Sequence, residues 1–323
     1  MQAPELSVVN RFFSAYRNHH SPHQRSKEVD EDFKKKEQAF LNIFQIGLFE
    51  IYEFLYQHCK DDAHFEAWLI ELKGKTIYDE ALFQFNRYRE DGRQFNPQKF
   101  NSILSQEQQL FWEQNGYLKI DQVIDGQRCD AIIRCITDEL QVDLTAPESW
   151  YRTHSKLQGM MLQLYQGEVF DAIRQDLHIR DIFASLYGHQ NIMPNCDKVS
   201  FNPPVNDRYT FKGSPLHWDI DFNIGPRYYI QGLVYLNDTP VNRGPLTLVP
   251  GYHHQLANVL KEFHDPELAI NSLREKKQEI AIAGQQGDLV LWLESLPHAA
   301  SPNRSELPRF VQYVSFSELP VGD

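Results

Sequence analysis

After residue 195 the sequence becomes a series of short apolar stretches separated by turn residues, and this pattern constrains the fold more than any other feature. Proline, glycine and asparagine supply the turns, as in Pro203-Pro204, Pro250-Gly251 and Pro302-Asn303. The apolar stretches cover residues 230–236, 246–249, 280–282, 289–293 and 310–316. Several short strands at close spacing are typical of an antiparallel sandwich or a jelly roll.

The first 100 residues have a different pattern, because their apolar residues recur at steps of three or four. The clearest stripe predicts one helix and consists of Phe40, Phe44, Leu48, Ile51 and Leu55. Further helices are predicted at 64–72, 78–88, 107–115 and 126–140, with a short strand at 117–120. The predicted fold class is therefore α+β, with a helical extension over residues 1–100 and a β-rich domain over residues 101–323.

The chain is acidic, since 32 Lys and Arg against 44 Asp and Glu give a net charge of −12. This charge disfavours nucleic acids and anionic membranes as partners, because both are negatively charged. The sequence has no run of about 18 apolar residues, so no transmembrane helix is expected. The N-terminus lacks the apolar region of a secretory signal, so none is expected there. The four cysteines form no CxxC pair, which indicates reduced thiols in a cytoplasmic protein.

His217 and Asp219 are separated by one residue. On a strand such residues point to the same face, about 6.6 Å apart along the backbone, so both side chains can bind one ion. Asp221 shares that face but lies about 13 Å from His217 by the same rise, which makes Asp219 the better ligand. His298, between two predicted strands, is the leading candidate for a third ligand. Two histidines and one carboxylate form the facial triad of non-haem Fe(II) oxygenases.

An anionic cosubstrate would need a cationic partner, and two arginines follow His298. Arg304 lies in Pro-Asn-Arg-Ser, which predicts an exposed turn. Arg309 opens the alternating strand that continues to Phe316. A guanidinium on a rigid strand can bind a carboxylate through two hydrogen bonds, so Arg309 is the preferred residue.

These residues belong to a longer pattern that resembles the phytanoyl-CoA dioxygenase family. The matching parts are 111–118, 216–219, 231–238, 243–253, 287–292, His298, 301–303 and Arg309. The resemblance covers roughly residues 105–318 and leaves the first 100 residues unassigned. It implies a double-stranded β-helix, a cupin-like jelly roll with flanking helices.

The resemblance also implies an Fe(II)- and 2-oxoglutarate-dependent dioxygenase that uses O₂. It implies that His217, Asp219 and His298 bind Fe(II) and that Arg309 binds the distal carboxylate of 2-oxoglutarate. The expected reaction is hydroxylation of a C–H bond in a small molecule, for example a natural-product intermediate, with release of succinate and CO₂. Gln231 is a further candidate for contact with 2-oxoglutarate. The candidates for the substrate pocket are Tyr235, Phe222 and Tyr229.

Two alternatives remain beside this interpretation. A zinc hydrolase could use the same two histidines and aspartate, but Arg309 would then have no role. A binding or scaffold protein could keep the barrel without catalysis, although the intact ligand set argues against it. For the helical extension, two interpretations remain: a homodimer through these helices, or a lid over the pocket.

Overall fold

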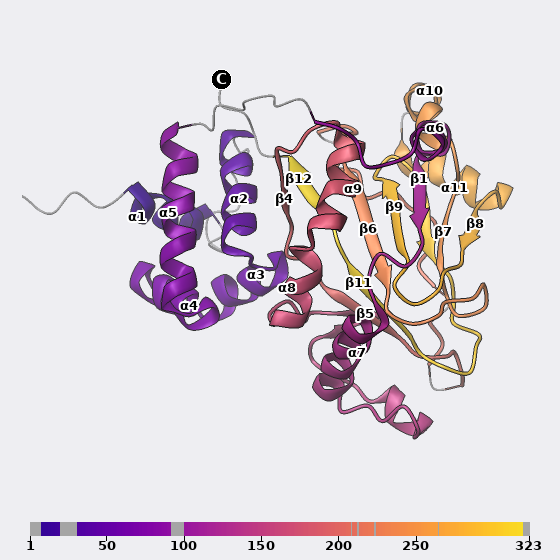
Figure 1. The fold of residues 1–323 in the computed structure, drawn as a ribbon, viewed down its shortest axis with the longest axis horizontal. Helices are drawn as coiled ribbons and strands as arrows, with labels where there is room; N and C mark the ends of the chain where they lie inside the picture. The colour runs from indigo at the N-terminus through magenta and orange to yellow at the C-terminus, as the bar shows by residue number, and fades with distance from the viewer. Residues whose placement is uncertain are drawn as a thin grey trace, which may run out of the picture. The chain divides into compact units, whose positions relative to one another are not determined.

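The computed structural model describes residues 8–19, 31–91, 100–207, 209–211, 213–222, 224–263 and 265–318. The chain divides into two compact units, and Figure 1 shows the ribbon of both. Unit 1 comprises Met1–Lys99, Asn191–Cys196 and Ser317–Asp323, and unit 2 comprises Phe100–Gln190 and Asp197–Phe316.

The described part of unit 1 is mainly helical, with an aromatic core. Its helices are α1 (Val8–His19), α2 (Glu31–Phe44), α3 (Leu48–Gln57), α4 (Asp62–Lys73) and α5 (Lys75–Asp91). A short strand, β4 (Ile192–Pro194), pairs with β12 (Phe316–Glu318). In the core, the ring centroids of Phe12 and Phe85 lie 4.9 Å apart and those of Phe40 and Phe44 lie 4.8 Å apart.

The prediction of one helix from Phe40 to Leu55 is wrong, because α2 ends at Phe44 and α3 begins at Leu48. Gln45 has a φ of 50°, which a continuing helix cannot adopt. Leu48 is 40% exposed and lies outside the core. A break of three residues preserves the apolar spacing, so the spacing alone could not reveal it.

Unit 2 contains two antiparallel sheets. The larger has the strand order β1-β9-β6-β11-β5-β3-β2, and the smaller has the order β10-β7-β8. Their bounds are β1 (Tyr117–Ile120), β2 (Leu157–Gln158), β3 (Met161–Leu162), β5 (Val199–Asn202), β6 (Ile230–Tyr235), β7 (Leu246–Leu248), β8 (Ile280–Ile282), β9 (Leu289–Leu293), β10 (His298–Ala300) and β11 (Arg309–Tyr313). The hydroxyl of Tyr235 on β6 donates to Ile282 O on β8 at 2.8 Å, so the two sheets face each other. This is the predicted α+β jelly roll.

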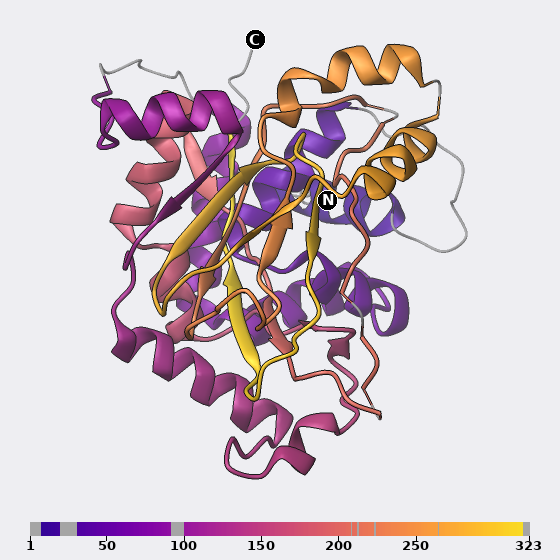
Figure 2. The same cartoon turned by 90° about the vertical axis from the view of Figure 1, so that its right-hand side faces the viewer.

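The helices of unit 2 were only partly predicted. They are α6 (Gln106–Asn115), α7 (Gly126–Leu140), α8 (Glu168–Arg174), α9 (Leu177–Tyr187), α10 (Leu256–Glu262) and α11 (Pro266–Lys276), with 3-10 turns at Pro147–Tyr151 and Tyr252–His254. α7 has the predicted bounds, but α10 and α11, drawn in orange in Figure 2, interrupt the region in which only strands were expected. Asp265 caps α11 and Pro266 begins it, a start signal that sequence reasoning missed. No helix in the described ranges is long and apolar enough to span a membrane.

Candidate metal centre

His217 and His298 lie directly opposite each other as an isolated antiparallel pair. The N–H of each residue donates to the carbonyl of the other at 2.9 Å. The imidazole centroids lie 4.6 Å apart. Asp219 is not in a strand, so the predicted strand geometry holds only at His217. The three side chains converge nevertheless.

The chain before His217 is held against the chain after His298. Ser214 Oγ accepts the N–H of Ala300 at 2.8 Å. Gly213 has a φ of +91°, and a Cβ atom at this position would lie 2.1 Å from Ala300 O. Only glycine allows this close approach, so the local sequence brings the two histidines together.

Both imidazoles are oriented by a backbone carbonyl. The Nδ1–H of His217 donates to Pro215 O at 2.8 Å, and that of His298 donates to Leu296 O at 3.1 Å. Because a carbonyl only accepts, this tautomer leaves both Nε2 lone pairs available. Asp219 Oδ1 lies 3.5 Å from His217 Nε2, and its Oδ2 lies 3.5 Å from His298 Nε2. The three candidate ligand atoms lie within 4.8 Å of one another, as one metal ion requires.

The pKa values of His217 and Asp219 also bear on metal binding. Burial lowers the pKa of the His217 imidazole, and the neighbouring His298 lowers it further. Burial raises the pKa of Asp219, but hydrogen bonds and charges from His298, Gln231 and His217 outweigh burial and hold this pKa well below its usual range. An ionised carboxylate is the form of Asp219 that binds a metal ion.

Arg309 is 1% exposed, and all its hydrogen-bond partners in the described part of the chain are neutral. Its guanidinium donates to Gly244 O, to Ser200 Oγ at 3.1 Å and to Met160 Sδ at 3.1 Å. Its Nε is buried and has no hydrogen-bond partner among the described residues. A buried charge of this kind is costly unless an anion compensates it. Arg304, by contrast, is exposed.

Register places several side chains on the same face of the large sheet. Gln231 pairs with Trp292 across β6 and β9, and Leu233 pairs with Tyr313 across β6 and β11. Paired residues share a face, and so do residues two or four apart on one strand. Gln231, Trp292, Tyr313 and Arg309 therefore share one face. Gln231 Nε2 donates to Asp219 Oδ2 at 2.6 Å, so this face is turned toward the three ligands.

Sequence reasoning missed two residues at this face, Trp292 and Tyr313. The Trp292 ring lies 5.5 Å from the His298 ring. Burial raises the pKa of Tyr313, the charge of Arg309 lowers it and that of Asp219 raises it, so the hydroxyl is close to both groups. Tyr313 could have been found from strand alternation, because it lies four residues after Arg309. Trp292 could be placed on this face only once the pairing of β6 with β9 was known.

The predicted pocket residues have different surroundings. Tyr235 is fully buried, and its hydroxyl donates to Ile282 O and accepts the N–H of Leu246; its role as a pocket residue stays a prediction. Phe222 is 37% exposed, and its ring lies 5.8 Å from that of Trp218, next to the ligands. Tyr229 is half-buried, and its hydroxyl donates to Ser315 Oγ at 3.0 Å.

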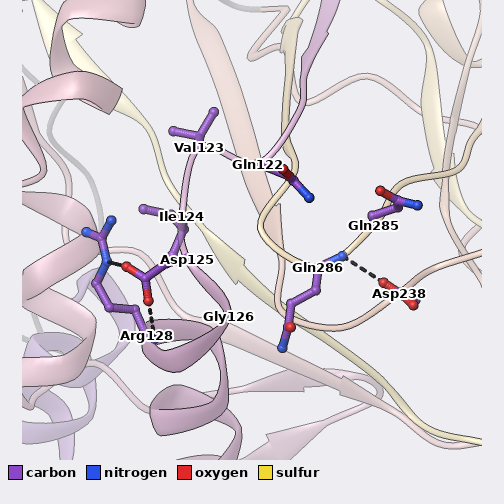
Figure 3. Close-up of a pocket in the computed structure, with 9 residues that line it drawn as sticks. All are labelled: Gln122, Val123, Ile124, Asp125, Gly126, Arg128, Asp238, Gln285 and Gln286. Carbon is purple, nitrogen blue, oxygen red and sulfur yellow. Dashed lines mark hydrogen bonds and ion pairs between the residues drawn. The ribbon is translucent and has the colours of Figure 1, made fainter.

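A cavity of about 640 Å³ lies in another part of unit 2 (Figure 3). It is lined by Gln122, Val123, Ile124, Asp125, Gly126, Arg128, Asp238, Gln285 and Gln286. Asp238 follows the end of β6 and Gln286 precedes β9, whereas Gln231 and Trp292 lie toward the other ends of these strands. The cavity is therefore separate from the metal ligands.

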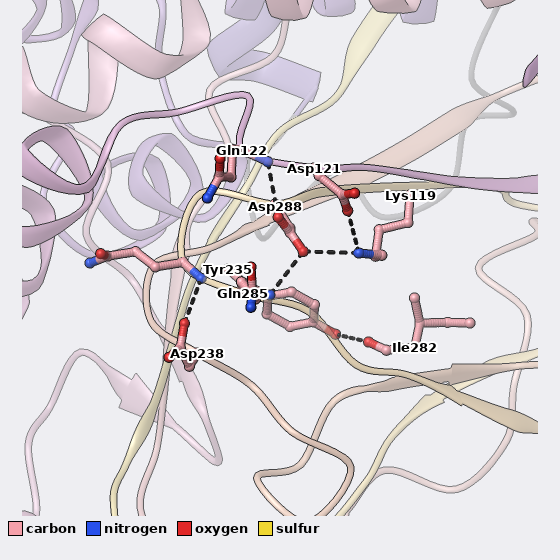
Figure 4. Close-up of polar contacts among 9 residues, drawn as sticks. Lys119, Asp121, Gln122, Tyr235, Asp238, Ile282, Gln285 and Asp288 are labelled. Carbon is pink, nitrogen blue, oxygen red and sulfur yellow. Dashed lines mark hydrogen bonds and ion pairs between the residues drawn. The ribbon is translucent and has the colours of Figure 1, made fainter.

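A buried carboxylate fixes the start of β9 near this cavity. Asp288 is 1% exposed, and it accepts hydrogen bonds from Gln122 N at 2.9 Å, Gln285 N at 2.8 Å and Lys119 Nζ at 3.0 Å (Figure 4). These bonds connect β1, its following turn and the turn before β9. Asp288 is thus a structural residue.

Comparisons with known proteins agree with this fold. EctD from S. alaskensis, solved with bound Fe, is 18% identical with a TM-score of 0.50, and the match covers 67% of this chain and 78% of that chain. The non-heme alpha ketoglutarate dependent epimerase SnoN from nogalamycin biosynthesis is 16% identical with a TM-score of 0.50, covering 66% and 81%. A Dictyostelium discoideum protein named "Putative phytanoyl-CoA dioxygenase" is 23% identical over 256 residues, which are 63% of this chain and 73% of the relative.

The jelly roll and the set of two histidines and one carboxylate fit the class of Fe(II)- and 2-oxoglutarate-dependent dioxygenases. The family model for phytanoyl-CoA dioxygenase (PhyH) matches residues 112–311, which is more than half of the sequence. The chain therefore belongs to the phytanoyl-CoA dioxygenase family. Its cofactors are Fe(II), 2-oxoglutarate and O₂.

Proposed function

We propose that His217, Asp219 and His298 bind Fe(II), and that the enzyme hydroxylates a C–H bond of a small molecule with release of succinate and CO₂. The convergence of three ligand atoms within 4.8 Å supports this proposal. Two histidines and one carboxylate would hold Fe(II) and leave further positions on the ion open for the cosubstrate and O₂. When bound, the iron and 2-oxoglutarate supply the oxidising chemistry, and the protein positions the reactants.

Arg309 is our candidate for binding the distal carboxylate of 2-oxoglutarate. Its buried guanidinium has only neutral hydrogen-bond partners in the described ranges, and its Nε has none. A carboxylate would compensate the charge and accept hydrogen bonds from the guanidinium. Ser200 Oγ and the Tyr313 hydroxyl, both near Arg309, are further donors for the same carboxylate.

The substrate class that we propose is a small neutral or cationic molecule, such as a natural-product intermediate. The net charge of −12 disfavours polyanionic substrates. SnoN, which shares the fold, belongs to nogalamycin biosynthesis. Phe222 and Tyr229, in the segment that follows Asp219, are the candidate substrate contacts.

Anaerobic titration of the purified apoprotein with Fe(II) and 2-oxoglutarate tests this function. We expect a visible charge-transfer band, because a 2-oxo acid bound to Fe(II) through two oxygens produces one. O₂ and candidate substrates should then yield succinate. Iron binding without the band would contradict the role of Arg309 and favour another metal chemistry, such as zinc hydrolysis. If the protein binds neither Fe(II) nor 2-oxoglutarate, the interpretation as a non-catalytic scaffold protein is favoured.

We also propose a homodimer through the helices of unit 1 and a cytoplasmic location. Ile77 and Phe83 on α5 are 53% and 63% exposed, which supports a contact surface on this helix. The four cysteines are free, as expected in a reducing compartment. Light scattering should give a dimer mass for the wild type and a monomer mass for Phe83→Glu. A wild-type monomer would exclude the dimer.

A further inference from the structure

We propose that Gln231 is a positioning residue that holds the Asp219 carboxylate in its metal-binding orientation, a role that rests on the proposed function of this site. Gln231 Nε2 donates to Asp219 Oδ2 at 2.6 Å. Because an ionised carboxylate only accepts hydrogen bonds, the Gln231 amide must present its NH₂ group to Asp219. Oδ2 is therefore engaged by Gln231, and Oδ1 remains available to an ion.

Gln231 completes a set in which each ligand has its own orienting partner. Pro215 O orients His217, and Leu296 O orients His298. Asp219 has no such carbonyl, lies outside the strands and has a side chain that is 46% exposed. Without Gln231 the carboxylate could rotate, whereas the two imidazoles would stay fixed. Partners of this kind orient metal ligands and raise metal affinity.

The backbone of Gln231 is well placed for this task. β6 lies between β9 and β11 within the large sheet, and Gln231 is paired with Trp292. At the neighbouring Gly232, an added Cβ atom would lie 2.8 Å from Val314 O, which shows how closely β6 is packed. Gln231 therefore reaches Asp219 from a rigid strand, and Asp219 lies on a segment that is not in a sheet.

The bond to Asp219, and not the second atom of the amide, distinguishes Gln231 from Gln312, another glutamine of the large sheet. Within the part of the chain that the structure describes, Gln231 Oε1 is buried and has no hydrogen-bond partner. An unpaired buried carbonyl reduces the stability of the folded protein. Gln312 Oε1 is buried in the same way, so the feature that sets Gln231 apart is the hydrogen bond of its Nε2 to a candidate metal ligand.

The test compares Gln231→Leu with a matched control, Gln312→Leu. Gln312 is a buried glutamine on β11, and its Nε2 donates to Phe170 O at 3.0 Å. It pairs with Val234, which lies three residues from Gln231 and so on the opposite face of the sheet. Both changes remove one amide hydrogen bond, but only the first removes a bond to a metal ligand.

Anaerobic titrations with Co(II) and with Fe(II), and melting of the apoproteins, give the readouts. For Gln231→Leu we expect metal affinity to fall about 10- to 100-fold and the visible Co(II) absorption to change shape. Its apoprotein should melt at the wild-type temperature or above, because water can hydrate the half-exposed Asp219. Gln312→Leu should melt at a lower temperature and keep the wild-type affinity and spectrum. Gln231→Asn, whose shorter amide cannot reach Asp219, should bind metal as weakly as Gln231→Leu.

Each outcome has a distinct meaning. Wild-type affinity and Co(II) spectrum in Gln231→Leu would overturn the positioning role and leave the proposed function intact. A lower melting temperature of Gln231→Leu with unchanged metal binding would assign Gln231 to the core, which also overturns the role. If the wild-type protein itself binds neither Co(II) nor Fe(II), the proposed function fails, and the positioning role fails with it.

Discussion

His217 and His298 exchange two backbone hydrogen bonds of 2.9 Å, so each candidate histidine ligand is positioned by the main chain of the other. A ligand pair that is built into the backbone does not depend on the metal for its arrangement. The third ligand, Asp219, can therefore be replaced without loss of the other two.

Asp219→Ala is expected to abolish the charge-transfer band with Fe(II) and 2-oxoglutarate and to reduce succinate formation below detection. The carboxylate is a ligand in our proposal, and the backbone bonds between the histidines do not involve it. Circular dichroism and thermal melting should therefore show a folded protein. Normal activity in this variant would disprove the assignment of Asp219.

Arg309→Ala is expected to weaken 2-oxoglutarate binding by about 2–5 kcal/mol, because the lost contact is a buried charge pair. The apoprotein should not lose an ion pair, since the partners of Arg309 in the described ranges are neutral. Titration with 2-oxoglutarate in the presence of Fe(II) measures the effect. Arg304→Ala is the control, and a larger effect there would show that the two arginines have been assigned in the wrong order.

Asp288→Ala is expected to lower the free energy of unfolding by roughly 2–4 kcal/mol, because the backbone N–H groups of Gln122 and Gln285 lose their acceptor. Denaturant unfolding measures this loss. Lys119→Met removes the partly exposed ion pairs of Lys119 with Asp288 and Asp121 and should cost about 1 kcal/mol or less. Equal effects of the two changes would show that the ion pair, and not the backbone bonds, stabilises this turn.

Glu294→Gln is expected to raise the stability of the protein above that of the wild type, and this gain should be larger at neutral pH than at low pH. Burial raises the pKa of Glu294, and its contacts with Arg227 oppose this only in part. The folded state thus disfavours the ionised carboxyl, so the wild type loses stability as the pH rises through the unfolded pKa toward the folded one. The glutamine has no such charge, and its amide oxygen can still accept the Arg227 N–H. Melting temperatures of both proteins between pH 4 and 8 should diverge as the pH rises; a constant difference would refute the shift.

The sequence allowed the candidate ligands to be chosen, because few residue types bind iron and because His217 and Asp219 lie close together in the chain. It also distinguished Arg309 from Arg304, since a strand and a turn have different residue patterns. Strand pairing decided the rest. Gln231 and Tyr235 share one face of β6, but only the three-dimensional structure shows that Gln231 donates to Asp219 and that the Tyr235 hydroxyl donates to Ile282 O. The break after Phe44 escaped prediction because the apolar spacing continues across it.

The neutral surroundings of Arg309 have a consequence for the lifetime of the protein. If 2-oxoglutarate supplies the missing anion, it binds the native state and not the unfolded chain. Its concentration then adds to the free energy of unfolding through mass action, by about 2.7 kcal/mol at one hundred times the dissociation constant. Proteolysis of the unfolded chain would slow accordingly, so the supply of this metabolite would regulate how much of the enzyme persists as well as how fast it works.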